Sequence, residues 1–154
     1  MNNISDIQKK IVEDIQKYGW HVIKVLEDEA GPAFGYSIGL FKTFAHPEIL
    51  IVGLNLNLIH EIINDIGKDV KSGKIYTSLA FYPHLIGGFE CYFTQVKQEF
   101  YEQYVGQALW YYDNNSFPLL QCIYPTTKGS YPWEKDSAAG IKDIQPILGE
   151  IKLN

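Results

Sequence analysis

The sequence predicts a single α+β domain over residues 1–154: a mainly antiparallel, twisted sheet of about six strands with about three helices packed on it. First, the expected helices and strands do not alternate strictly, as they would in a doubly wound parallel sheet. Second, only the short turn 28–32 separates the first two expected strands, which favours an antiparallel pair. Third, segment 33–40 alternates large apolar and small residues with the period of a strand.

The chain begins with an expected helix over 5–17 and an expected strand over 20–26. Ser5 and Gln8 have the spacing of a capping box, and the apolar residues of the helix fall on one stripe. The strand carries apolar groups on both faces, which predicts a central position or cover on both sides.

The expected strand 33–40 has two unlike faces. Its large face consists of Phe34, Tyr36, Ile38 and Leu40, and its small face of Ala33, Gly35, Ser37 and Gly39. Glycine in a strand marks a place where something approaches closely, either another part of the protein or a ligand. A loop over 41–47 and a strand over 48–54, apolar enough to be buried on both faces, are expected next.

The second half of the chain adds the remaining elements. Asn55 is a good N-cap for a helix that keeps its apolar spacing to about Lys71. Two strands over 75–81 and 89–96, joined by a loop over 82–88, are followed by a helix over 98–112 that Gly106 interrupts. A final strand over 117–124 precedes a turn-rich segment through 140 and a short tail.

Composition and charge narrow the classes of function. The formal net charge is -5, and no basic run exceeds two residues, so nucleic-acid binding is not expected. No apolar stretch has the length of a membrane span and no signal peptide precedes the domain, so neither membrane association nor secretion is expected and the cytoplasm is the predicted location. Cys91 and Cys122 lie in apolar, strand-like runs and are predicted to be buried thiols.

Six residues are candidates for a binding site: Tyr36, Ser37, His46, Glu48, His84 and Trp133. His46 and Glu48 could act as a base and its orienting group, or could instead fix the entry to a buried strand. Ser37 lacks the setting of a nucleophile elbow, and Trp133 could plug the core or form a binding platform.

No cofactor motif is present and no metal site is predicted. None of the four histidines has the spacing of a metal motif. A metal site assembled in three dimensions from His46, His84 and Cys91 remains an alternative.

Several ordered motifs resemble the bacterial domain-of-unknown-function family 4262. They are 18–20 (YGW), 34–40 (FGYSIGL), 46–54 (HPEILIVGL), 121–125 (QCIYP), 129–133 (GSYPW) and 145–148 (QPIL). The resemblance covers about residues 18–148 and implies a bacterial origin. One departure is Thr126, where relatives often carry an acidic residue. The resemblance supplies no catalytic residues.

Two functions are therefore expected. The favoured one is a non-catalytic module that binds a partner protein, in the manner in which bacterial immunity proteins neutralise theirs, because the chain is acidic, rich in tyrosine and without a recognisable catalytic set. The alternative is a small enzyme or small-molecule-binding protein that uses the glycine face of strand 33–40 with His46 and Glu48. The oligomeric state is left open.

Overall fold

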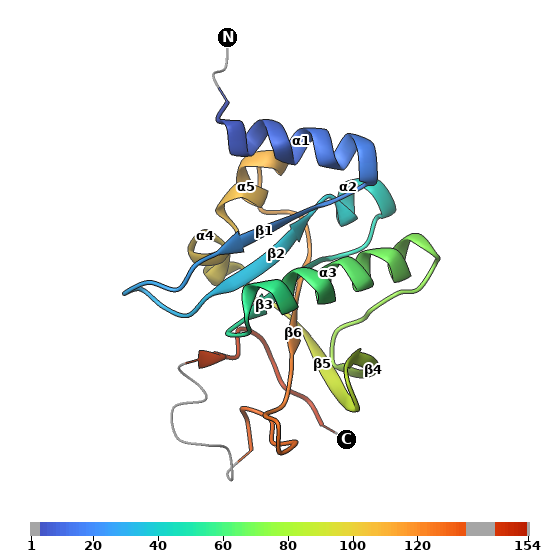
Figure 1. The fold of residues 1–154 in the computed structure, drawn as a ribbon, viewed down its shortest axis with the longest axis vertical. Helices are drawn as coiled ribbons and strands as arrows, with labels where there is room; N and C mark the ends of the chain where they lie inside the picture. Colours follow the sequence, from blue (N-terminus) through green and yellow to red (C-terminus); the bar gives the residue numbers. More distant parts are fainter. Residues whose placement is uncertain (1–3, 135–143, 154) are drawn as a thin grey trace.

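The computed structural model describes residues 4–134 and 144–153, and these form one six-stranded sheet (Figure 1). The strands are β1 (His21–Val25), β2 (Phe34–Ile38), β3 (Glu48–Val52), β4 (Ala80–Ile86), β5 (Phe89–Gln95) and β6 (Leu119–Ile123). Their order across the sheet is β1-β2-β3-β6-β5-β4. Only β3 and β6 run parallel, and every other neighbouring pair is antiparallel. The predicted fold class is confirmed.

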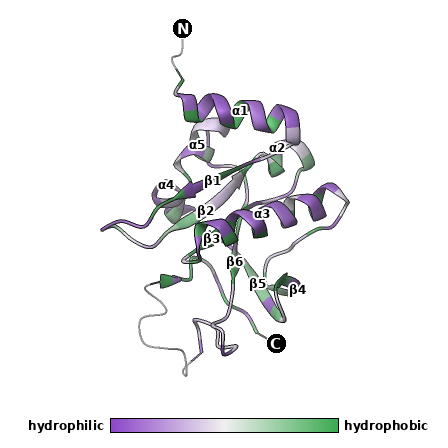
Figure 2. Cartoon of the chain, viewed as in Figure 1, coloured by the Kyte–Doolittle hydropathy of each residue, from purple (hydrophilic) through white to green (hydrophobic). Residues whose placement is uncertain are grey.

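Helices cover both faces of the sheet. They are α1 (Asp6–Tyr18), α2 (Leu40–Phe44), α3 (Leu56–Lys71), the short 3₁₀ helix η1 (Gln98–Phe100), α4 (Tyr101–Tyr104) and α5 (Gly106–Tyr112). Buried side chains of α3 share one core layer with β3, β5 and β6. Side chains of α1, α4 and α5 share the other layer with β2 and the opposite face of β3. The central strands are coloured as hydrophobic in Figure 2, whereas α1 is largely hydrophilic outside its buried stripe.

The ends of α1 follow the sequence closely. The Ser5 hydroxyl accepts a hydrogen bond from the Gln8 amide, and the Gln8 side chain accepts one from the Ser5 amide, so the predicted capping box is present. Gly19 ends the helix at φ 102°, a left-handed conformation that glycine adopts without strain. The chain thus turns sharply from α1 into β1.

Of the two predicted alternatives for β1, the structure has cover on both sides and not a central position. β1 lies at one end of the sheet and pairs only with β2 within the described residues. Val22 packs in the α3-side layer and Ile23 against the opposite layer, so both faces of the strand are covered. The apolar residues on both faces correctly predicted this cover. They could not show that β1 lacks a second neighbouring strand within the described residues.

Other boundaries also differ, and the strand predicted over 75–81 begins only at Ala80, as β4. Strand 33–40 ends at Ile38, and the predicted loop after it contains helix α2. The predicted loop 82–88 is mostly strand β4, whose pairing with β5 shifts register between Tyr82 and Ile86, where His84 has φ 72°. The helix predicted over 98–112 is broken into three pieces, with a break at Val105. These differences raise the helix count above the expected three, and part of the turn-rich segment and tail, 135–143, lies outside the described residues.

Candidate functional site

Of the six candidate residues, the structure brings Ser37 and Glu48 into direct contact. Ser37 is the residue before the last of β2, Glu48 begins β3, and the side chains of both are fully buried. The Ser37 hydroxyl donates to Glu48 Oε1 at 2.7 Å and accepts a hydrogen bond from the Ile49 amide at 2.9 Å. The pair therefore joins the ends of two neighbouring strands.

The Glu48 carboxylate is also the cap of helix α2. Oε2 accepts from the amides of Gly39 at 2.8 Å and Phe41 at 3.3 Å, and Oε1 accepts from the amide of Leu40 at 3.2 Å. The hydroxyl of Tyr112 in α5 donates to Oε2 as well. Five donors thus converge on a group with about four lone-pair sites, which leaves no acceptor for a ligand.

Burial dominates the electrostatics of this cluster. It raises the pKa of the Glu48 carboxyl above its ordinary value, and the hydrogen bonds from Tyr112, Ser37 and the α2 amides partly oppose that change. Burial and the nearby Glu48 carboxyl also raise the pKa of the Tyr112 hydroxyl. Ser37 and Glu48 are closed to solvent, Tyr112 is partly buried, and the cluster holds β2, β3, α2 and α5 together.

His46 is likewise used within the protein. Its side chain is 3% exposed, its Nδ1 lies 2.8 Å from the Pro47 carbonyl oxygen, and its Nε2 accepts from the Tyr76 amide at 3.0 Å. The first contact requires a proton on Nδ1 and the second a lone pair on Nε2, so the ring is neutral. Burial lowers the pKa of His46, which favours the same form. His46 therefore fixes the segment before β4 against the start of β3.

Protein covers the small face of β2. A Cβ on Gly35 would lie 2.6 Å from Cγ2 of Ile59 in α3, and one on Gly39 would lie 2.6 Å from the Gly19 carbonyl oxygen. The close neighbours that the glycines predicted are thus α3 and the α1–β1 junction. No room is left at these two positions for a ligand lying flat on the strand.

The remaining candidates lie apart from this cluster. His84 is exposed on β4. Trp133 stacks on Tyr131 with a centroid distance of 4.7 Å and packs edge-on against Tyr92 at 5.3 Å. Tyr36 faces the α1 side of the sheet, where its hydroxyl accepts from the Gln107 amide at 3.1 Å and burial raises its pKa to about 12.

The described residues contain neither a cluster of metal ligands nor a membrane-spanning helix. Within 4–134 and 144–153, no group of three or more His, Cys, Asp or Glu residues is placed to hold a metal ion. None of the helices in these ranges is long and apolar enough to cross a bilayer. Cys91 and Cys122 are both fully buried, as predicted.

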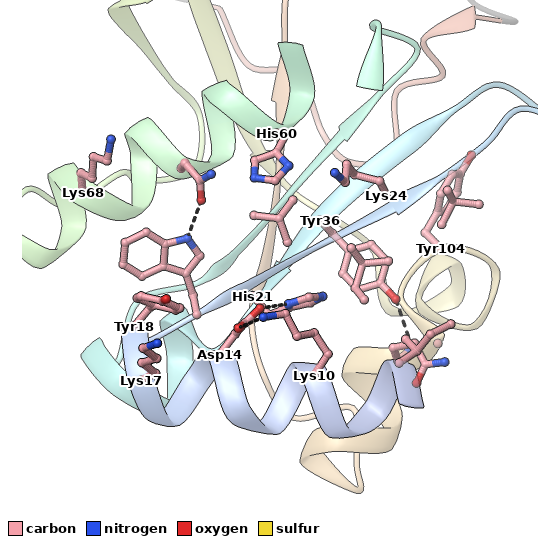
Figure 3. Close-up of a pocket in the computed structure, with 18 of the residues that line it drawn as sticks. Lys10, Asp14, Lys17, Tyr18, His21, Lys24, Tyr36, His60, Lys68 and Tyr104 are labelled. Atoms are coloured by element: carbon pink, nitrogen blue, oxygen red, sulfur yellow. Dashed lines mark hydrogen bonds and ion pairs between the residues drawn. The ribbon is translucent and has the colours of Figure 1, made fainter. Parts of the chain in front are cut away.

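A large hollow among the described residues follows the edge of β1 that faces away from β2. It is an open groove of about 1110 Å³ between α1 on one side and α3 on the other, closed at one end by α4 and α5. Figure 3 shows β1 running between the two helices, with Lys10, Asp14 and Lys17 on α1 and His60 and Lys68 on α3. We call it the β1-edge groove.

Packing fixes the width of the β1-edge groove. The Trp20 ring lies against Gly67, where a Cβ would come within 2.5 Å of the indole, and Trp20 Nε1 donates to Asn64 Oδ1 at 3.0 Å. On the other side, Asp14 Oδ2 contacts His21 Nδ1 at 2.6 Å. Burial alone would raise the pKa of Asp14, but the hydrogen bonds from Lys10 and His21 outweigh it and lower the pKa. β1 is thereby attached to both flanking helices.

The charge of the β1-edge groove is opposite to that of the whole protein. Its lining includes Lys10, Lys17, Lys24, Lys68 and Lys71, but only the two carboxylates of Asp14 and Glu102. With histidines neutral, the groove carries a formal charge of +3, whereas the whole chain carries -5. The remainder of the protein therefore carries -8, so the groove and the rest of the chain differ in the sign of their net charge.

Sequence reasoning missed this groove because its lysines come from three elements. Tyr36 is the one predicted site residue in its lining among the described residues. A usable signal was the spacing of Lys68 and Lys71, which places both on one side of α3. Lys68 and Lys71 share the groove with Lys24 because β1 is an edge strand, and the apolar pattern of β1 did not indicate an edge position.

Comparison with known proteins gives one result. A family model described as "Domain of unknown function (DUF4262)" matches residues 14–138. No curated protein and no solved structure matches.

Proposed function

The chain belongs to the domain-of-unknown-function family 4262, and from this premise we propose that it is a non-catalytic module that binds an acidic segment of a partner protein in the β1-edge groove. The single observation that carries the proposal is the grouping of five lysines around a sheet edge that no other described strand pairs with, in a protein of net negative charge. Potentials of opposite sign steer partners together and select among them.

Further features support binding in preference to chemistry. Five donors occupy the carboxylate of Glu48, and both ring nitrogens of His46 have backbone partners. The β1-edge groove, in contrast, presents tyrosines and lysine side chains, which combine apolar contact area with charge. Neutralising the activity of the bound partner, as immunity proteins do, is one role that such a module could serve.

Reversal of the groove charge tests this function. We expect a chemical cross-link between the tagged wild-type chain and a discrete partner in extract of the native cell. The triple variant Lys24→Glu/Lys68→Glu/Lys71→Glu should lose at least about nine-tenths of it, because three attractive contacts become repulsive. The readout is the intensity of the cross-linked band, identified by mass spectrometry.

The matched control reverses three exposed lysines elsewhere, Lys9, Lys97 and Lys128. It changes the net charge by the same amount and should keep the partner. Equal loss of the cross-linked partner in both triple variants would show that only the net charge of the chain matters, which contradicts the proposal. A groove variant that keeps the partner would show that the partner binds elsewhere. The absence of any partner for the wild-type chain would also contradict the proposal.

A further inference from the structure

We propose that the β1-edge groove binds its partner by strand addition, taking an extended segment in which acidic and apolar residues alternate, as a seventh strand beside β1. This inference rests on the proposed function and specifies the partner segment at the same site. Sheet edges with unpaired amides and carbonyls are recurrent docking sites for extended peptides, in which the backbone supplies affinity and alternate side chains supply specificity.

The backbone of β1 is free on one side. The carbonyl oxygen of Ile23 points toward β2, since it lies 2.9 Å from the position that a Cβ would take on Gly35. The amide and carbonyl of one strand residue point to the same side, and those of its neighbours to the opposite side. The amides and carbonyls of Val22 and Lys24 therefore face the groove, and within the described residues β1 has no strand partner except β2.

The side of the groove formed by α3 is cationic. Lys24 is on the same face of β1 as Val22, which packs in the α3-side layer. Lys24 and His60 of α3 line the same part of the groove (Figure 3), and burial together with the charge of Lys24 lowers the pKa of His60. Together with Lys68 and Lys71, this side carries three lysines and no carboxylate in the groove lining.

The opposite side of the groove is neutral and rich in apolar surface. The charges of Lys10 and Lys17 are balanced there by Asp14 and Glu102. This side presents the exposed side chains of Ile7 and Tyr18, and the buried Tyr36 and Tyr104 line its floor.

An added strand directs successive side chains to opposite faces. Carboxylates would consequently face α3, and the apolar residues between them would face α1. The five residues of β1 span roughly 17 Å at the rise of an antiparallel strand, so about five partner residues would fill the edge.

Charge selects this occupant over a second copy of the chain. Pairing of β1 with β1 of another molecule would bring two sets of Lys24, Lys68 and Lys71 together, and like charges across an interface oppose association. An acidic segment supplies the opposite sign at the same places.

The test measures binding of an eight-residue peptide of alternating Glu and Val, capped at both ends, by isothermal titration to the full chain. We expect saturable one-to-one binding. Binding should weaken at least about tenfold in the Lys24→Glu/Lys68→Glu/Lys71→Glu variant, but not in the Lys9→Glu/Lys97→Glu/Lys128→Glu variant. A peptide of alternating Lys and Val should not bind.

Backbone methylation distinguishes strand addition from simple charge attraction. In an antiparallel addition, the residue opposite Lys24 shares its face and exchanges both backbone hydrogen bonds with it. Methylation of the Glu amide nitrogens should then weaken binding at least about tenfold, and methylation of the Val nitrogens should have little effect. The reverse asymmetry would indicate parallel addition and would equally support a seventh strand.

The outcomes separate the two proposals. If the peptide binds with groove-dependent affinity but both methylated forms bind equally, an acidic partner stands and strand addition is wrong. If the peptide does not bind, but the groove variant still loses the cross-linked partner, the proposed function stands. The inference that the partner segment alternates acidic and apolar residues is then wrong. If sedimentation shows a dimer that the groove variant dissociates, a second copy occupies the edge and the proposal fails.

Discussion

The variant Glu48→Gln is expected to lose about 3 kcal/mol or more of its free energy of unfolding. Both carboxylate oxygens of Glu48 accept hydrogen bonds, and one of them becomes an amide nitrogen that cannot accept. Whichever way the amide turns, at least two buried donors lose their acceptor and face an N–H group. Each unsatisfied buried group costs about 1 to 3 kcal/mol. Urea denaturation followed by circular dichroism measures the loss.

Two control variants locate the effect. Glu61→Gln changes an exposed glutamate on α3 and should alter the free energy of unfolding by less than about 0.5 kcal/mol. Tyr112→Phe removes one of the five donors and should cost about 1 kcal/mol. A Glu48→Gln protein as stable as Glu61→Gln would show that the carboxylate does not hold the β2–α2 corner.

The second large effect is expected at Gly39, which links β2 to α2. Its φ of 121° is one that L side chains rarely adopt. An alanine Cβ would lie 2.6 Å from the Gly19 carbonyl oxygen and 2.8 Å from the Trp20 Cα. Gly39→Ala should therefore lower the free energy of unfolding by about 3 kcal/mol or more, from backbone strain and overpacking together.

Gly73 provides a matched control for Gly39. It has φ 102°, and a Cβ there would meet nothing within 4 Å. Gly73→Ala retains the backbone strain without the collision and should cost about 1 to 2 kcal/mol. Equal losses in the two variants, measured by the same denaturation, would mean that the close approach of the α1–β1 junction to Gly39 contributes nothing.

The sequence predicted the parts of the fold that depend on local patterns. The capping box at Ser5, the N-cap at Asn55 and the alternation in 34–38 are each written in a few neighbouring residues, and the structure contains all three. The small residues of β2 correctly indicated close neighbours. Their identity depends on Ile59 of α3 and on the α1–β1 junction, which no local pattern specifies.

The sites could be predicted only in part, for the same reason. Ser37, His46 and Glu48 were predicted as candidates for a binding site, with fixing the entry to a buried strand as the alternative for His46 and Glu48. The donor that completes the cluster, Tyr112, is 64 positions from Glu48 in the chain. β1 carries apolar side chains on both faces, as a central strand would, so its sequence did not distinguish an edge strand from a central one. The grouping of Lys24 with Lys68 and Lys71 follows from that edge and became apparent only with the fold.

Amide hydrogen exchange at Val22 and Lys24 tests the central claim most directly. Exchange is followed by NMR in the full chain, with and without a saturating amount of the alternating Glu and Val peptide. The β1-edge groove account predicts that the groove-facing amides of Val22 and Lys24 exchange at least about tenfold more slowly when the peptide is bound. The Ile23 amide, already directed toward β2, should change little. Unchanged exchange at Val22 and Lys24 with the peptide bound would contradict the account.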